Sequence, residues 1–201
     1  MDLGLQDKRV IVSGASRGIG LAIAERFVAE GASVAFFARG EADVRTAEEK
    51  LNREGVAYGT ALDGADHAAL RSWVDAAAAQ LGGIDIVINN TSASASIEWT
   101  EAAWRQSFEV DLMGAVTICD AALPWLEASD AAAILQIATV TAFEQHDMSV
   151  CPSYGAIKAA TVNHAAQLAQ NWGEKGIRSN SLSPGPIYIE GGAWQNIKEN
   201  Y

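Results

Sequence analysis

Basic side chains, cysteines and long apolar segments are all scarce in this sequence. There are 14 lysines and arginines against 25 aspartates and glutamates in 201 residues, which gives a formal net charge of −11. A protein that coats nucleic acid or an anionic membrane needs a positive surface, so this charge balance argues against both partners. No apolar run approaches the roughly 18 residues that a membrane span needs, and the amino-terminal segment has no secretory hydrophobic region. We therefore expect a cytoplasmic protein that binds neither nucleic acid nor a membrane.

The cysteine content is too low for a disulfide framework or a cysteine-based metal site. The two cysteines, Cys119 and Cys151, show no metal-ligand spacing, so we expect no bound metal. Hydrophobic residues make up 49% of the chain and charged residues 19%, a composition typical of globular proteins rather than disordered ones. The length suits one domain with a substantial core. We therefore expect residues 1–201 to form a single domain.

Short apolar runs alternate with helical segments along the chain. The runs that predict strands cover residues 9–13, 33–38, 56–62, 84–89, 133–138 and 177–182. The segments between them predict helices, among them residues 41–54, 66–81, 100–127 with a break or kink at Pro124, and 152–175. Continuous apolar strands separated by helices are typical of a parallel sheet covered on both faces. The sequence therefore predicts an α/β fold with a doubly wound, Rossmann-like parallel sheet.

A glycine-rich turn follows the first predicted strand and opens the first helix. It reads Gly14-Ala15-Ser16-Arg17-Gly18-Ile19-Gly20. Glycine permits a positive φ in a tight turn and lets the backbone approach a pyrophosphate, and a helix amino terminus favours an anion. A plain strand–helix connection uses similar residues, but the position of this turn favours dinucleotide binding. We therefore expect these residues to form a phosphate cradle.

The end of the second predicted strand indicates which dinucleotide is bound. Enzymes that use NAD place an acidic residue about 20 residues after the turn, where it binds the ribose 2′-hydroxyl. This chain has Arg39 there and no acid, and Arg39 together with Arg17 can hold a 2′-phosphate through charge-assisted contacts. Two surface arginines without a ligand are the alternative interpretation. The pattern favours NADP(H) over NAD(H).

Tyr154 and Lys158 form a candidate acid/base pair. They lie four residues apart at the start of a predicted helix, so they share one helix face. A free tyrosine has a pKa near 10, which is too high for a general base at neutral pH. A neighbouring ammonium stabilises the phenolate and lowers that pKa. The pair therefore predicts proton transfer by Tyr154.

Over nearly its whole length the chain resembles the short-chain dehydrogenase/reductase family. The resemblance rests on the glycine-rich turn, Asp63 after the third strand, Asn89-Asn90 after the fourth, Tyr154-x-x-x-Lys158, and Ser183-Pro184-Gly185 after the sixth. It implies an oxidoreductase that acts on a secondary alcohol or ketone. It also implies a homo-oligomer, a dimer or a homotetramer.

The resemblance further implies a role for each matching residue. Tyr154 exchanges a proton with the substrate oxygen, and Lys158 binds the nicotinamide ribose and depresses the tyrosine pKa. Asp63 contacts the adenine, and Asn90 lines the cofactor cleft. The segment Pro184-Gly185-Pro186-Ile187 lies against the nicotinamide. The loop that contains Phe143, His146 and Met148 faces the substrate in the family.

Several positions depart from the family pattern. The catalytic serine after the fifth strand is absent, and either Thr139 or Thr141 takes its place, depending on how the loop is counted. Threonine keeps the hydroxyl but adds a methyl group that crowds the site. Asp111 replaces an asparagine that helps to hold a water beside the lysine. Ile189 replaces a threonine that bonds the nicotinamide carboxamide.

These departures leave a second hypothesis open. Family members continue past the sixth strand into a substrate lid and a last strand, which we expect to be absent from these 201 residues. Together with Thr139 and Asp111, this motivates a dinucleotide-binding protein with little or no redox turnover, in a regulatory or scaffold role. The first hypothesis is an NADP(H)-dependent oxidoreductase.

Overall fold

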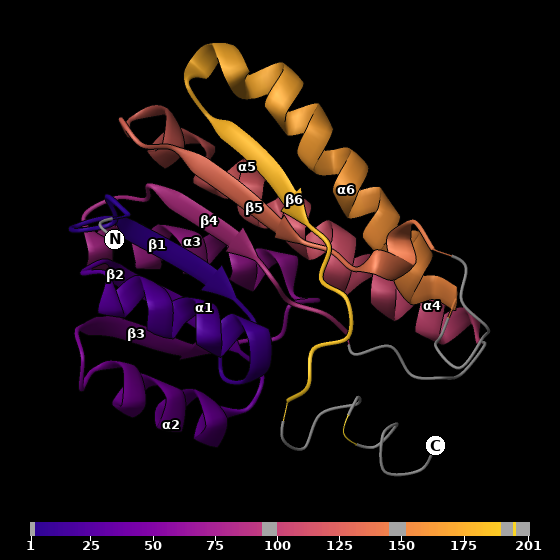
Figure 1. Cartoon of the computed structure of the whole chain (residues 1–201), viewed down its shortest axis with the longest axis horizontal. Helices are drawn as coiled ribbons and strands as arrows, with labels where there is room; N and C mark the ends of the chain where they lie inside the picture. Colours follow the sequence, from indigo (N-terminus) through magenta and orange to yellow (C-terminus); the bar gives the residue numbers. More distant parts are fainter. Residues whose placement is uncertain (1–2, 94–99, 145–151, 190–194, 196–201) are drawn as a thin grey trace.

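The computed structural model describes residues 3–93, 100–144, 152–189 and 195. Six strands form one sheet: β1 (Arg9–Ser13), β2 (Ser33–Ala38), β3 (Val56–Ala61), β4 (Ile86–Asn89), β5 (Ala133–Ile137) and β6 (Arg178–Leu182). All neighbours pair in parallel, in the order β3-β2-β1-β4-β5-β6 (Figure 1). The predicted doubly wound parallel sheet is confirmed, with strand boundaries that differ by up to two residues.

Helices connect the strands on both faces of the sheet. They are α1 (Gly18–Ala29), α2 (Glu41–Leu51), α3 (His67–Leu81), α4 (Glu101–Ser107), α5 (Gly114–Glu127) and α6 (Pro152–Trp172). A π-helix, Phe108–Met113, joins α4 to α5, and short 3₁₀ turns cover Val140–Ala142 and Gly173–Lys175. The expected break at Pro124 is wrong, because α5 continues through Pro124 to Glu127. A proline so close to a helix end costs few hydrogen bonds, so the packed last turn persists.

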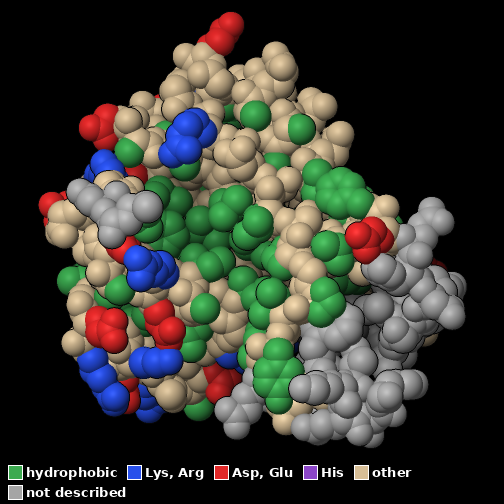
Figure 2. Space-filling model, in the orientation of Figure 1, with side chains coloured by type: hydrophobic (Ala, Val, Ile, Leu, Met, Phe, Trp, Pro, Cys, Tyr) green, Lys and Arg blue, Asp and Glu red, His purple; other side chains and the backbone are tan. Residues whose placement is uncertain are grey.

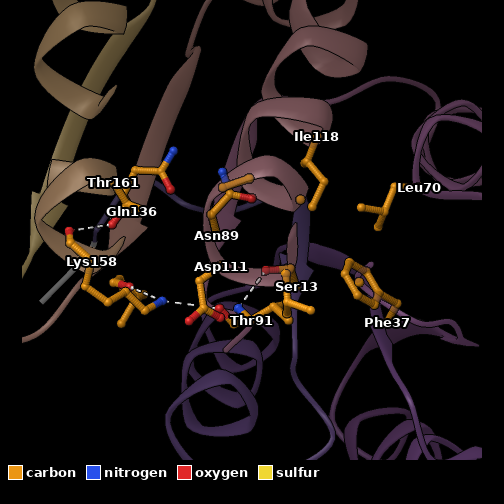
Figure 3. Close-up of a pocket in the computed structure, with 15 residues that line it drawn as sticks. Ser13, Phe37, Leu70, Asn89, Thr91, Asp111, Ile118, Gln136, Lys158 and Thr161 are labelled. Carbon is orange, nitrogen blue, oxygen red and sulfur yellow. Dashed lines mark hydrogen bonds between the residues drawn. The ribbon is translucent and has the colours of Figure 1, made fainter. Parts of the chain in front are cut away.

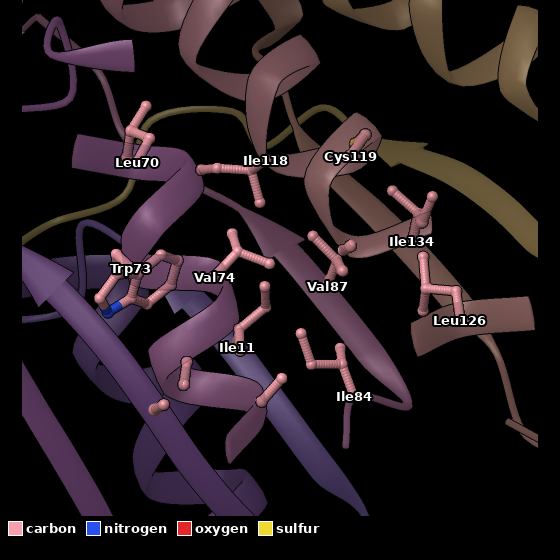
Figure 4. Packing of buried hydrophobic residues seen from close by; sticks show 14 of the residues in the cluster. Ile11, Leu70, Trp73, Val74, Ile84, Val87, Ile118, Cys119, Leu126 and Ile134 are labelled. Carbon is pink, nitrogen blue, oxygen red and sulfur yellow. The ribbon is translucent and has the colours of Figure 1, made fainter. Parts of the chain in front are cut away.

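Strand side chains alternate between two hydrophobic clusters, one on each face of the sheet. Ile11 of β1 points into the cluster formed with α3 and α5, whereas its neighbours Val10 and Val12 point into the cluster on the α1 and α2 side. Figure 4 shows the first cluster, in which Trp73 and Val87 pack with Ile11. Burial on both faces explains why these strands are continuous apolar runs.

The kinds of side chain on the surface differ along the face of the sheet that α1 and α2 cover. Lysine, arginine, aspartate and glutamate side chains are interspersed over α1 and α2, and hydrophobic side chains are visible between α1 and α6 (Figure 2). On that face Leu135 of β5 is only partly buried. In the part of the chain that the structure describes, no helix is long and apolar enough to cross a membrane.

The parallel arrangement gathers the predicted functional residues at one edge. Gly14, Arg39, Asn90 and Thr139 each follow the carboxyl end of a strand, β1, β2, β4 and β5 respectively. The strand order reverses between β1 and β4, and ligands of open α/β sheets bind outside the carboxyl ends at such a switch point.

Candidate active site

A cleft of about 400 Å³ lies at the carboxyl edge of the sheet. Most of the site residues predicted from the sequence line it, namely Gly14, Ser16, Arg17, Gly18, Ile19, Arg39, Asp63, Asn90, Tyr154 and Lys158. Residues from five strand–helix connections therefore meet at one cavity, from the glycine-rich turn at one end to Tyr154 and Lys158 of α6.

The glycine-rich turn has the geometry of an anion cradle. Gly14 and Gly18 have φ values of 68° and 62°, a region that side chains disfavour. A Cβ on Gly20 would lie 2.3 Å from the Gly14 carbonyl oxygen, so this position needs glycine. Gly20 itself does not line the cleft. No side chain caps the amino terminus of α1 at Arg17, which leaves its first N–H groups for a ligand. These residues fit a dinucleotide pyrophosphate.

Asn90 braces this turn from the neighbouring strand. Its side-chain Nδ2 donates hydrogen bonds to the carbonyl oxygens of Ser13 (3.1 Å) and Gly14 (2.9 Å). The Ser13 hydroxyl in turn accepts from the backbone N–H groups of Asn90 (2.8 Å) and Thr91 (3.0 Å). Asn90 therefore fixes the β1 and β4 loops to each other as well as lining the cleft.

Charged side chains of both signs line the nucleotide end of the cleft. Arg17 and Arg39 are exposed there, as the sequence predicts, and Asp63 lines the same cavity. Asp43, in the first turn of α2, also lines the cleft and was missed by the sequence analysis. Its place four residues after Arg39 was the signal that could have found it.

Tyr154 lines the cleft and meets Thr139 rather than Thr141, and neither threonine lines the cleft itself. The side chains of Tyr154 and Thr139 are hydrogen-bonded, and Thr139 Oγ1 also accepts from the Thr141 hydroxyl (3.1 Å) and backbone N–H (3.3 Å). Thr141 thus holds the Thr139 side chain in place through these two hydrogen bonds. Burial raises the pKa of Tyr154, an effect that the hydrogen bond from Thr139 opposes and the charge of Asp111 reinforces. This direction is opposite to the one that the family resemblance implies.

Lys158 is buried one helical turn after Tyr154. Its side-chain Nζ donates to the carbonyl oxygens of Thr91 and Ile137, both at 3.2 Å. Burial lowers the pKa of Lys158, and the negative charge of Asp111 acts in the opposite direction.

Asp111 lies in the π-helix and points inward. Its carboxylate accepts hydrogen bonds from the Ala93 N–H (2.6 Å) and the Ser92 hydroxyl (3.4 Å). Burial raises the pKa of Asp111, while the charge of Lys158 lowers it. π-Helices are rare and occur frequently at functional sites.

An inner pocket lies beneath the cleft and shares Lys158 with it (Figure 3). Asn89, Asp111, Gln136 and Thr161 contribute polar side chains to its lining. Its volume of about 10 Å³ suits about one water molecule. Lys158 therefore contacts a polar interior on one side and the cleft on the other.

The loop after β6 lines the cleft with a different residue from those that the family resemblance implies. Pro184, Gly185 and Ile187 do not line the cleft, whereas Ile189 does. The Pro184 carbonyl accepts a hydrogen bond from the Val140 N–H (3.1 Å), which ties this loop to the Thr139 turn.

Two of the three residues expected to face the substrate cannot be placed. Phe143 is 69% exposed, and His146 and Met148 lie outside the described residues. Among the described residues, no group of three His, Cys, Asp or Glu side chains could hold a metal ion.

Comparison with known proteins identifies the family. The sequence model of the short chain dehydrogenase family matches residues 8–200. The chain is a short-chain dehydrogenase. It is therefore a nicotinamide-dependent oxidoreductase, as the glycine-rich turn and the Tyr154–Lys158 spacing predict.

The named relatives of this short-chain dehydrogenase are named for different substrates. It is 36% identical over 199 residues to the isoepoxydon dehydrogenase of Penicillium expansum, covering 96% of this chain and 75% of the relative. It is 31% identical to the D-threitol dehydrogenase of Mycolicibacterium smegmatis, covering 96% and 76%. The crystal structure of L-sorbose reductase from Gluconobacter frateurii, complexed with NADPH and L-sorbose, has a TM-score of 0.88 and 29% identity, covering all of this chain and 82% of that one.

Proposed function

We propose that this short-chain dehydrogenase uses NADP(H) to interconvert a ketone and a secondary alcohol, with Tyr154 as the acid/base. The observation that carries the proposal is that Tyr154 and Lys158 line the same cleft as the glycine-rich turn, with the Thr139 side chain hydrogen-bonded to Tyr154. The L-sorbose reductase that this chain resembles was solved with NADPH and a ketose, and this supports the substrate class.

The site residues divide the work between binding and proton transfer. The cofactor, when bound, supplies or removes the hydride. The amino terminus of α1 and the turn from Gly14 to Gly20 hold the pyrophosphate. Asp63, which lines the same cleft, contacts the adenine in this proposal. Lys158 holds the ribose hydroxyls near Tyr154. These contacts fix the orientation of the cofactor relative to Tyr154.

Proton transfer is assigned to Tyr154. Its raised pKa means that it carries its proton at neutral pH, so it can donate that proton to a carbonyl oxygen as hydride arrives. We assign to Thr139 a hydrogen bond to the same oxygen, which is the role of the family serine. The extra methyl group of threonine restricts how this hydroxyl is presented.

Substitution of Tyr154 tests the enzymatic role. We expect Tyr154→Phe to reduce kcat by at least about 100-fold, the usual size of acid/base catalysis, while the Kd for NADPH stays within about twofold. The matched control is Tyr58→Phe, because Tyr58 packs at the hydrophobic cluster far along β3 from the cleft lining. Equal turnover by Tyr154→Phe and the parent would remove the assignment.

Selection of NADP(H) over NAD(H) is tested through Arg39. The proposal rests on two exposed arginines in the cleft and on the absence of an acid at the end of β2. We expect Arg39→Gln to weaken NADPH binding about tenfold and to leave NADH binding unchanged. Arg45→Gln is the control, since Arg45 is an exposed arginine of α2 that pairs with Glu41 outside the cleft. Equal loss for both cofactors would contradict a 2′-phosphate contact.

The names of the relatives do not favour the second hypothesis, a dinucleotide-binding protein without turnover. Its test is the double variant Thr139→Ser with Asp111→Asn. Turnover that appears only in this variant would establish the second hypothesis. We also propose that the protein is cytoplasmic and that it forms a homo-oligomer, a dimer or a tetramer. Light scattering on the purified protein tests the oligomeric state.

A further inference from the structure

Two buried side chains of opposite charge line the inner pocket beneath the cleft. Asp111 is 2% exposed and Lys158 is 3% exposed. Figure 3 shows the Asp111 carboxylate directed to the part of the inner pocket where the Lys158 nitrogen lies, and each charge acts on the other. Their hydrogen-bond partners are all neutral: two backbone carbonyls for Lys158, and an N–H and a hydroxyl for Asp111.

Among the described residues, Asp111 is the one charge that acts on Lys158, and Lys158 is the one charge that acts on Asp111. The neighbouring helices α5 and α6 also carry Asp120 and His164, which act on each other, and burial lowers the pKa of His164. The ends of β4 and β5 contribute neutral side chains, and the only other titratable group of the π-helix, Glu109, is exposed. Tyr154 precedes Lys158 on α6, and the buried thiol of Cys119 has its pKa raised to about 12, so it is neutral. Arg17, Arg39, Asp43 and Asp63 also line the cleft, but none of them is among the charges that shift the pKa of Asp111 or Lys158. Asp111 and Lys158 are therefore each other's only neighbouring opposite charge in the described structure.

A buried ammonium without a counter-charge gives up its proton, because desolvation penalises the charged form. Two carbonyl acceptors reduce that penalty but carry no net charge. An asparagine at position 111 would still accept the Ala93 N–H through its Oδ1, yet it would supply no charge to Lys158. The carboxylate is thus the feature that distinguishes this site electrostatically from one with an amide there.

We propose that Asp111 is a positioning residue that keeps the buried Lys158 protonated, so that a cationic lysine is present at the cofactor ribose at neutral pH and above. The π-helix supplies the geometry, because it places Asp111 against the inner pocket while its neighbour Glu109 stays exposed. The role at the ribose rests on the proposed function. The dependence of the lysine charge on Asp111 is a property of the protein alone.

The direct test is the titration of Lys158 itself. Protein labelled with ¹⁵N-lysine contains five lysines, and the Lys158 signal is assigned by its loss in Lys158→Met. We expect Asp111→Asn to lower the pKa of Lys158 by about one unit or more. Glu109→Gln, which removes a carboxylate two residues away on the same π-helix, is expected to leave it unchanged. An identical Lys158 titration in Asp111→Asn and the parent would overturn the proposal.

A reciprocal titration covers the case in which Asp111→Asn does not fold. In Lys158→Met the Asp111 carboxyl loses its counter-charge, so we expect its pKa, followed by ¹³C-aspartate NMR, to rise relative to the parent. An unchanged Asp111 titration would show that the two charges are independent and would refute the pairing.

A binding measurement connects the pair to the cofactor site. In the parent the Kd for NADPH is expected to stay level with rising pH until Lys158 deprotonates; in Asp111→Asn the loss of affinity should begin at least about one pH unit lower. In a Lys158→Arg background the charge cannot be lost, so Asp111→Asn should not change the pH profile. A profile that shifts equally in both backgrounds would contradict action through Lys158. If the parent binds no NADPH, the proposed function fails while the lysine titration still decides the pairing.

Discussion

A second charge pair, in which only the carboxylate is fully buried, lies at the opposite edge of the sheet and gives the sharpest test of stability. Asp85 precedes β4, and its side chain is 4% exposed. Its carboxylate accepts three hydrogen bonds from Arg9, from the backbone N (2.8 Å), Nε (2.9 Å) and Nη2 (2.6 Å), and one from the Ser129 hydroxyl (2.6 Å). Asp85→Ala removes all four at once.

The expected loss of stability in Asp85→Ala depends on how well water can solvate the Arg9 side chain that is left unpaired. Removing one partner of a buried ion pair costs about 3–5 kcal/mol, because the other charge is left unpaired. The Arg9 side chain is 31% exposed and keeps a hydrogen bond to the Gly82 carbonyl (2.7 Å), so water can solvate part of it. We therefore expect the lower end of the range, a loss of about 3 kcal/mol in the free energy of unfolding.

The loss depends on pH in a defined direction. Burial acts to raise the pKa of Asp85, but the hydrogen bonds from Arg9 and Ser129 outweigh it, so the folded-state pKa lies well below the ordinary value of about 3.9. A depressed carboxyl pKa contributes stability above the unfolded-state pKa, and that stability disappears as the pH falls towards the folded-state value. The difference between Asp85→Ala and the parent should be constant near neutrality and shrink below about pH 4.

Urea unfolding of the parent, Asp85→Ala and Asp130→Ala measures these differences. Asp130 is the matched control, since its side chain is 93% exposed and lies 3.7 Å from the Lys8 Nζ. An exposed pair of this kind contributes under about 1 kcal/mol. If the two variants lose the same stability, or if the Asp85→Ala loss grows on acidification, the reasoning is refuted.

Three further outcomes follow from packing and burial. Gly20→Ala should weaken NADPH binding at least about tenfold in a fluorescence titration, because its Cβ would lie 2.3 Å from a backbone oxygen of the turn; parent-like affinity would contradict this. Gly155→Ala should lower kcat about tenfold, since its Cβ would lie 2.7 Å from the Thr141 carbonyl oxygen, whereas Gly173→Ala, with nothing within 4 Å, should not. Because burial raises the pKa of Cys119 to about 12, mass spectrometry should find it alkylated only after unfolding, and rapid labelling of the native protein would show that it is accessible.

The sequence predicts the fold well because its signals are local and redundant. The residues Val10, Ile11 and Val12 of β1 are apolar on both faces of the strand, and the structure buries them against helices on both faces of the sheet. The glycine-rich turn was predicted from its glycines and from its position between the first strand and the first helix, and the 2.3 Å approach at Gly20 supplies the steric reason for one of these glycines. Such features depend on residues that are near one another in the chain.

The site was harder to predict where it depends on distant parts of the chain. Counting residues could not choose between Thr139 and Thr141, because the answer depends on which hydroxyl meets Tyr154 across the loop. The π-helix around Asp111 was also missed, since apolar periodicity does not reveal a change of backbone hydrogen bonding within a helical segment. Likewise, only the folded loop shows that Ile189 lines the cleft while Pro184, Gly185 and Ile187 do not.

The two charge pairs illustrate how the fold separates stability from chemistry. Arg9 and Asp85 lie at the amino ends of β1 and β4, whereas Asp111 and Lys158 lie beneath the carboxyl edge that holds the cleft. Asp85 has strong direct contacts with its cation, so its proton is fully lost at neutral pH. Asp111 and Lys158 are held mainly through neutral groups, and burial pushes both towards their uncharged forms. A pair of the first kind contributes to the stability of the fold, whereas in a pair of the second kind each group depends on the charge of the other to stay ionised, so Asp111 can set the charge that Lys158 presents to the cleft.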